Sequence, residues 1–351
     1  APGDVPKGGW MSVLYMMGDW VNFRKLPANL RAAFGDAKDG RITDEVREYL
    51  SDNQMRHYCD SGQYPNANAL IISGLRDVLF NPLQGLAARE CFTDAGRDVK
   101  LVIDRDGHLL PGEQFSNELP GWAIDNQLYC GDQVMDTEQA AVDWLKGELG
   151  LGQGASLPSI CVSLDKWGVA MREWPAHGET LPLPPVTLKG NGSGRWEWIN
   201  APRDWMATLA TETSLKEKFA QPHDGGWRPA FVPLLTAATD EQRVGTPVIS
   251  LEAEQLDVPV LAAVVVRRAG SASLSLAHQQ VTPIRTGRPA SLPPVALSLE
   301  AGDQVGLVLL SRHDQFNTLD LDFAGGVTFT GSIDFPLALQ GDSAAGTLSQ
   351  R

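Results

Sequence analysis

Asp104, Asp106 and His108 stand at alternate positions of one short segment, and their side chains could perform acid–base chemistry. A carboxylate and an imidazole held near one another can move a proton to or from a substrate, or bind one metal ion. Solvated turn residues explain the same pattern, because Asp106-Gly107 is a strong turn signal. The three residues are therefore the candidate catalytic group, with no reaction assigned to them.

A second candidate site rests on tryptophan, of which the chain holds 10. Trp196, Trp198 and Trp205 form the densest group, and the first two would share one face of a strand. Such a pair could stack on a sugar ring or anchor a contact with another protein. Packing in a core is the alternative fate of these side chains. The pattern predicts a binding surface for a protein partner or a glycan.

Short motifs that carry a specific mechanism are missing from the sequence. It contains no G-x-S-x-G elbow, no H-E-x-x-H pair, and no dinucleotide- or phosphate-binding loop. Ligands at the spacing of a zinc or calcium site are missing too. We therefore expect no cofactor and no metal, and a recognition or assembly protein in preference to an enzyme. The alternative is a hydrolase that cuts a carbohydrate polymer with two carboxylates, a chemistry that needs no short motif, and that carries a β-sandwich as an accessory module.

The charge of the chain excludes some classes of partner. Its 43 acidic and 29 basic residues give a net charge of −14, which would repel the phosphates of nucleic acid. The apolar runs are far shorter than the roughly 20 residues needed to cross a bilayer, so we expect no membrane insertion. The first residues show no secretion-signal pattern, which fits a cytoplasmic protein or a processed secreted one.

The four cysteines lie far apart in the sequence, at Cys59, Cys91, Cys130 and Cys161. This spacing excludes a C-x-x-C zinc or redox pair. An even number permits two disulfides in an oxidising compartment. Buried thiols also suit a chain of this size, and we expect them in preference to disulfides.

The first two thirds of the chain mix helix and strand patterns. Apolar residues at three- and four-residue spacing predict helices, and Pro82 is expected to interrupt one of them. The proline-rich residues 175–194 are expected to form a loop. Helices are predicted over residues 20–34, 43–59, 83–91, 138–149 and 204–219, a buried strand over 69–74, a hairpin over 100–110 and a strand pair over 159–174.

From residue 246 onward, strand patterns separated by glycine and proline replace the helices, at the spacing of a β-sandwich. Residues 297–310, LSLEAGDQVGLVLL, resemble the strand–turn–strand element of jelly-roll and carbohydrate-binding β-sandwiches. The resemblance implies a sandwich but no particular function. We therefore expect an α+β chain. Its length of 351 residues exceeds what one hydrophobic core usually spans, which predicts two domains. A mixed α/β domain over 1–240, with room for a subdomain break near 175–194, would precede an antiparallel, jelly-roll-like β-sandwich over 246–345.

Overall fold

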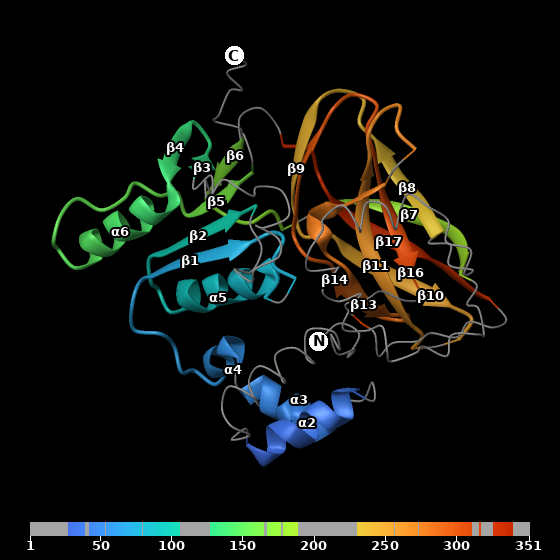
Figure 1. Ribbon diagram of the computed structural model, residues 1–351, viewed down its shortest axis with the longest axis horizontal. Coiled ribbons are helices and arrows are strands. Elements are labelled where there is room, and N and C mark those ends of the chain that lie inside the picture. Colours follow the sequence, from blue (N-terminus) through green and yellow to red (C-terminus); the bar gives the residue numbers. More distant parts are fainter. Residues whose placement is uncertain are drawn as a thin grey trace, which may run out of the picture.

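The structure is a computed structural model that combines helices with mainly antiparallel strands, which confirms the predicted α+β class. Figure 1 shows the helices and one small sheet on one side of the molecule and most of the strands on the other. We refer to these sides as the α/β part and the β part. The structure describes residues 27–38, 42–52, 54–78, 80–105, 127–164, 167–176, 178–188, 230–255, 257–272, 274–310, 316 and 326–339.

The α/β part is built on a four-stranded sheet in the order β1-β2-β5-β6. The first three of these strands are parallel, and β6 runs antiparallel to β5. The crossover from β1 to β2 is helix α5, which packs against both strands (Figure 1). The predicted strand over 69–74 and the strand pair within 159–174 are confirmed. The bounds are β1 (Ala69–Gly74), β2 (Val99–Asp104), β5 (Ile160–Ser163), β6 (Gly168–Met171) and α5 (Pro82–Asp94).

Two predictions for this sheet are wrong. β2 is not an arm of a hairpin, because residues 101–103 are buried and pair with a parallel strand on each side. A central parallel strand is a continuous apolar run, and that outweighs a turn signal beyond its end. Pro82 does not interrupt a helix either. It is the first residue of α5, where the missing N–H costs nothing, and the Asn81 side chain caps the helix by accepting from the Leu83 N–H.

The other elements of the α/β part are α2 (Ala28–Lys38), α3 (Asp44–Asp52), α4 (Met55–Asp60), α6 (Thr137–Glu148) and the hairpin strands β3 (Gln127–Cys130) and β4 (Gln133–Asp136). The predicted α6 is confirmed, with Asp136 as its cap. The helix expected over 43–59 is instead two helices, because the backbone at Gln54 is extended. Of the helix expected over 20–34, residues 20–26 are outside the described ones and most of the rest belongs to α2. Residues 204–219 are outside the described ones as well. In the described part of the chain no helix is long and apolar enough to span a membrane.

The β part contains two larger sheets, in the orders β14-β10-β17-β7 and β12-β11-β16-β8 with β13 also on β11, and the pair β15-β9. Alternate residues of β11, such as Val260 and Val264, share one buried cluster with Leu251 of β10 and Phe329 of β17. The two larger sheets therefore pack face to face. The elements are β7 (Gly178–Leu188), β8 (Ala230–Thr236), β9 (Glu241–Gly245), β10 (Val248–Ala253), β11 (Pro259–Arg267), β12 (Ser275–Leu276), η1 (Ala277–Gln279), β13 (Thr282–Arg285), β14 (Pro289–Ser291), β15 (Val295–Leu299), β16 (Gln304–Leu310) and β17 (Val327–Pro336).

The loop expected over 175–194 is wrong, because most of it is β7, a strand of 11 residues paired with β17. Three prolines, Pro182, Pro184 and Pro185, suggested a loop. Proline is tolerated in a strand that lies at the edge of a sheet, and β17 is the one sheet neighbour of β7 among the described strands. Strands β7 and β8 thus belong to the β part although they precede residue 246 in the sequence. The division of the chain into two domains and the jelly-roll type stay predictions.

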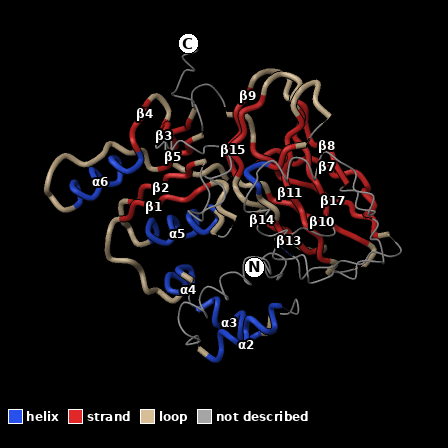
Figure 2. The backbone as a smooth tube through the Cα atoms, in the orientation of Figure 1, coloured by secondary structure: helices blue, strands red, loops and turns tan. Residues whose placement is uncertain are grey.

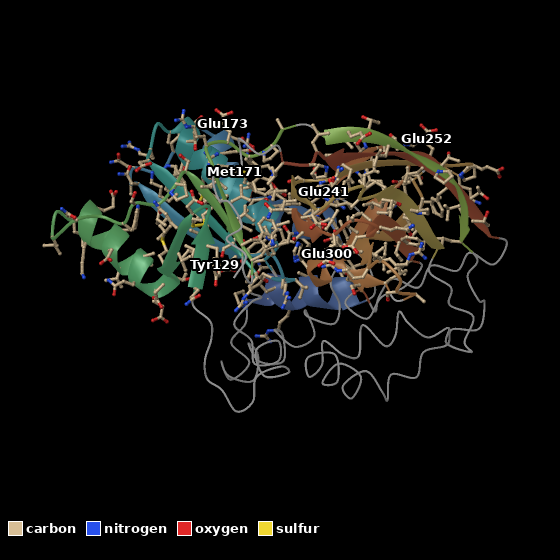
Figure 3. The ribbon with its side chains drawn as sticks, turned by 90° about the horizontal axis from the view of Figure 1, so that it is seen from above. Tyr129, Met171, Glu173, Glu241, Glu252 and Glu300 are labelled. Carbon is tan, nitrogen blue, oxygen red and sulfur yellow. A yellow bond between two sulfur atoms is a disulfide. The ribbon has the colours of Figure 1, made fainter. Side chains whose placement is uncertain are left out.

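The two parts share a hydrophobic core. Val244 of β9 and Ala296 of β15 pack in one buried cluster with Leu101 of β2 and Ile160 of β5. Figure 2 shows β9 and β15 at this junction. In the view from above, Tyr129 and Met171 lie in the α/β part and Glu252 lies far across the β part (Figure 3). The β part therefore supports the sheet of the α/β part directly.

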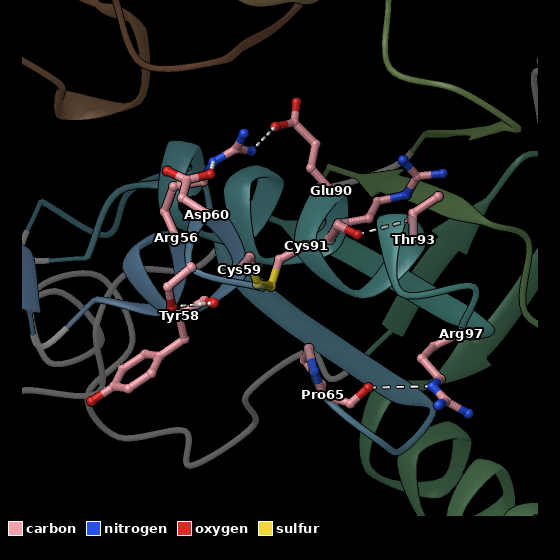
Figure 4. The surroundings of a disulfide bond; sticks show 11 residues. Arg56, Tyr58, Cys59, Asp60, Pro65, Glu90, Cys91, Thr93 and Arg97 are labelled. Atoms are coloured by element: carbon pink, nitrogen blue, oxygen red, sulfur yellow. Dashed lines mark hydrogen bonds and ion pairs between the residues drawn. A yellow bond between two sulfur atoms is a disulfide. The ribbon is translucent and has the colours of Figure 1, made fainter. Parts of the chain in front are cut away.

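All four cysteines form disulfides, which corrects the expectation of buried thiols. Cys59–Cys91 joins α4 to α5, and Cys130–Cys161 joins β3 to β5, at Cα–Cα distances of 5.8 and 5.2 Å. Sequence spacing cannot show which cysteines meet, because the fold decides it. Figure 4 shows the first disulfide beside the ion pairs of Arg56 with Asp60 and Glu90.

Candidate functional site

The carboxyl ends of the parallel strands β1 and β2 lie side by side, with Gly74 opposite Asp104 in register. In open α/β sheets, ligands bind beyond the carboxyl ends of the strands. The chain leaves β1 through residues 75–78, which we call the acid turn, and then enters α5. This edge carries two acidic residues, Asp77 on the acid turn and Asp104 at the end of β2.

Asp77 is 8% exposed, and hydrogen bonds hold it on both sides. Its N–H donates to the Gly74 carbonyl (3.1 Å), and its Oδ1 accepts from the Phe80 N–H (2.8 Å). The Leu75 N–H donates to the Asp104 carbonyl (2.8 Å), which ties the acid turn to β2. Burial of a carboxylate costs free energy unless the group is hydrogen-bonded or paired. A buried, fixed carboxylate at a strand end can orient a neighbouring base.

The structure places only one of the sequence-predicted site residues. Asp104 is half-buried at the end of β2. Asp106 and His108 lie outside the described residues, and so do Trp196, Trp198 and Trp205, so their roles stay predictions. Where side chains are described, no group of three or more His, Cys, Asp or Glu could hold a metal ion. Sequence reasoning missed Asp77, whose signal is an acid three positions after the glycine that ends an apolar strand.

The acid turn also contacts the β part. The side-chain amide of Gln280 donates from Nε2 to the carbonyls of Leu75 (2.8 Å) and Asp77 (3.0 Å). Two residues earlier, His278 Nε2 accepts from the Ala296 N–H (3.0 Å). A cavity beside Gln280 has about 10 Å³ of room, enough for a single water molecule and too little for a substrate.

His278 is neutral at ordinary pH. Burial lowers its pKa to about 4, and the positive charge of Arg76 acts in the same direction. An unfolded histidine has a pKa of roughly 6.5. Between these values the unfolded chain binds a proton that the folded protein does not, so the folded state loses stability as the pH falls from about 6.5 to about 4.

We expect this residue to reduce the free energy of unfolding by about 2 kcal/mol over that pH range, allowing for its partial exposure. His278→Asn removes the titrating group and suits the left-handed backbone, with φ of 52°. Urea unfolding at several pH values should give a flatter stability curve for this variant than for the wild type. Equal slopes for His278→Asn and wild type would contradict the expectation.

The fold of the chain is similar to that of a solved hydrolase structure. No protein-family model and no curated protein matches the chain. A CocE/NonD family hydrolase from Staphylococcus aureus aligns with a TM-score of 0.51 at 11% identity, over 97% of this chain and 65% of that one. An aminopeptidase from a marine sediment Thaumarchaeota archaeon gives 0.49 at 12% identity, over 82% and 57%. An α-amino acid ester hydrolase gives 0.44 at 14% identity, over 77% and 55%.

The chain therefore shares its architecture with a CocE/NonD family hydrolase, and at this identity the likeness concerns the fold alone. The chain spans less than two thirds of the length of each of these structures. The fold corrects the emphasis on protein or carbohydrate binding that the tryptophans suggested. At the level of the fold, the hydrolase alternative is better supported than the recognition protein.

Proposed function

We propose that this chain is part of a hydrolase of ester or amide bonds and that Asp77 is the acid that orients its general base. One observation carries the proposal: Asp77 is buried at the carboxyl end of the parallel strand β1. The fold supports it, because a CocE/NonD family hydrolase shares this architecture. A hydrogen-bonded carboxylate holds a histidine in the right orientation and stabilises its protonated form.

His108 is the general base in this proposal. In the sequence it follows Asp104, the last residue of β2, by four positions, and β2 is the neighbour of β1. In α/β-hydrolases the triad occurs in the order nucleophile, acid, histidine. Asp77 precedes His108 as that order requires. An acid after one parallel strand and a histidine after the next fits acyl chemistry better than cleavage of a polysaccharide between two carboxylates.

The nucleophile is not assigned to this sequence, which contains no G-x-S-x-G elbow. The acid and the base thus belong to this chain, and the nucleophile belongs to another part of the enzyme. The acid–base pair can be tested in the chain as it stands.

Asp77→Asn is expected to lower the pKa of His108 by about one to two pH units, because it removes the opposite charge that favours the imidazolium. The titration of the histidine ring carbons by NMR measures this, with His108→Gln used to assign the resonance. Hydrolysis of p-nitrophenyl acetate, an activated ester that a base can cleave through water, should fall at least tenfold in both variants.

The matched control is Asp94→Asn, which removes the same charge from the exposed far end of α5. It should leave both the titration and the ester hydrolysis unchanged. If His108 titrates identically in wild type and Asp77→Asn, the acid–base pair is refuted. If all three variants hydrolyse the ester at the wild-type rate, the hydrolase proposal itself fails.

A further inference from the structure

The side chain of Gln280, in the β part, reaches the acid turn. Gln280 follows η1, about 200 residues after the turn in the sequence, and its Nε2 donates to the carbonyls of Leu75 and Asp77. Leu75 is fully buried, and Asp77 and Gln280 are 8% and 5% exposed. Both hydrogen bonds are therefore made in the interior, where the loss of a partner costs most.

The backbone carbonyls of Leu75 and Asp77 need a hydrogen-bond donor, and the side-chain amide of Gln280 is one. Two of the turn's own N–H groups are used within the α/β part, since Leu75 donates to Asp104 and Asp77 donates to Gly74, and the Phe80 N–H after the turn donates to the Asp77 carboxylate. The two carbonyls accept from Gln280. One amide nitrogen carries two N–H bonds, so it can serve both carbonyls at once, whereas a carboxylate can only accept. The same requirement fixes which end of the amide faces the turn.

The backbone of Gln280 is fixed within the β part. Its backbone N–H donates to the Ala277 carbonyl (3.2 Å). His278, between them, adopts a left-handed backbone with φ of 52°, and its ring accepts from the Ala296 N–H on β15. Ala296 belongs to the core that the two parts share. The chain from η1 to Gln280 is thus fixed to β15 and, through the shared core, to the sheet that ends in the acid turn.

We propose that Gln280 is a positioning residue for Asp77, so that the β part sets the place of the acid. This rests on the proposed function in one respect only, the role of Asp77 as an acid. The Asp77 carboxylate belongs to the acid turn and accepts from the Phe80 N–H just after it. A shift of the Leu75 and Asp77 carbonyls would therefore move the carboxylate as well. The β part would then be a component of the site and not a separate accessory module.

Amide hydrogen exchange in Gln280→Ala and Gln280→Glu tests the anchoring directly. The Leu75, Asp77 and Phe80 amides should exchange at least tenfold faster than in the wild type, and Gln280→Glu should be the stronger of the two, because it sets a carboxylate against two carbonyls. The Val308 amide in the centre of β16 should be unchanged. The control is Val281→Ala, which removes a buried neighbouring side chain of the β part and should leave the acid turn protected.

The second measurement is the NMR titration of His108 with and without Asp77→Asn. In the Gln280→Ala background, Asp77→Asn should shift this titration by less than half as much as it does in the wild-type background. Faster exchange confined to the acid turn, together with this reduced shift, supports the proposal. Unchanged exchange at the turn, or equal acceleration at Val308, overturns it.

If Asp77→Asn leaves His108 unaffected in the wild type, the proposed function fails by itself. The exchange measurement then still decides whether Gln280 anchors the turn, so the two failures are distinguishable.

Discussion

The double variant Cys130→Ala/Cys161→Ala is expected to lower the free energy of unfolding by about 4 kcal/mol. The disulfide joins residues separated by 31 positions, and opening it returns that loop entropy to the unfolded chain. In the folded state both cysteines lie in a buried cluster with Leu128 and Val102, so the fold keeps these strands together while the unfolded state gains freedom. Urea unfolding under non-reducing conditions measures the difference.

The matched control is Cys59→Ala/Cys91→Ala, which opens a loop of nearly equal length, with a separation of 32. Cys59 is the one residue of α4 that is described as buried. Without the disulfide, α4 should detach locally and exchange its amides quickly, while the global transition moves less than in the first variant. Equal losses of the global free energy of unfolding in the two variants would show that loop entropy alone sets the effect of each disulfide. An unchanged midpoint for Cys130→Ala/Cys161→Ala would contradict the prediction.

Asp303→Ala is expected to lower the free energy of unfolding by about 3 kcal/mol, because it removes three hydrogen bonds to a charged group. The Asp303 carboxylate is 1% exposed and accepts from the Glu300 N–H, the Ala269 N–H (2.9 Å each) and the Arg268 guanidinium. It thus ties the turn between β15 and β16 to the turn after β11. Thermal and urea unfolding measure the loss.

The pH dependence of the same residue has a definite sign. Burial opposes the charge of Asp303, but the hydrogen bonds from Glu300, Ala269 and Arg268 outweigh it and hold its pKa below the usual value. Its contribution is therefore fully present above about pH 4 and is lost as the pH falls through the folded pKa. Asp240→Ala is the control, since the exposed Asp240 accepts one hydrogen bond, from Ala301. If Asp240→Ala lowers the free energy of unfolding as much as Asp303→Ala does, burial of the carboxylate is not the cause of the loss.

Short sequence patterns predicted the helices and strands whose start or burial is set by their own residues. The cap at Asp136 marks the start of α6, and the apolar run over Ala69–Gly74 marks β1. The resemblance over residues 297–310 predicted a strand, a turn and a strand, and β15 and β16 are those strands. It could not show that the turn passes between sheets, since β15 pairs with β9 and β16 with β11. Pairing partners come from the whole fold.

The candidate site was predictable only in outline. The carboxylate at Asp104 was found because it stands near a histidine in the sequence, whereas Asp77 stands apart from any such neighbour. The side chain that donates to its carbonyl, Gln280, lies about 200 residues away. No spacing rule connects residues so distant, and no motif marks a glutamine that serves two carbonyls. The fold has to be known before Asp77 and Gln280 can be associated.

The prolines of β7 have a consequence for the behaviour of the protein in concentrated solution. The outer edge of a sheet is a template on which another chain can add a strand, and long, flat edges lead to aggregation. Neighbouring residues of a strand direct their N–H groups to opposite sides, so at least one of Pro184 and Pro185 removes an N–H from the outer edge of β7. Among the described strands, growth of the sheet by self-association is therefore disfavoured at this edge.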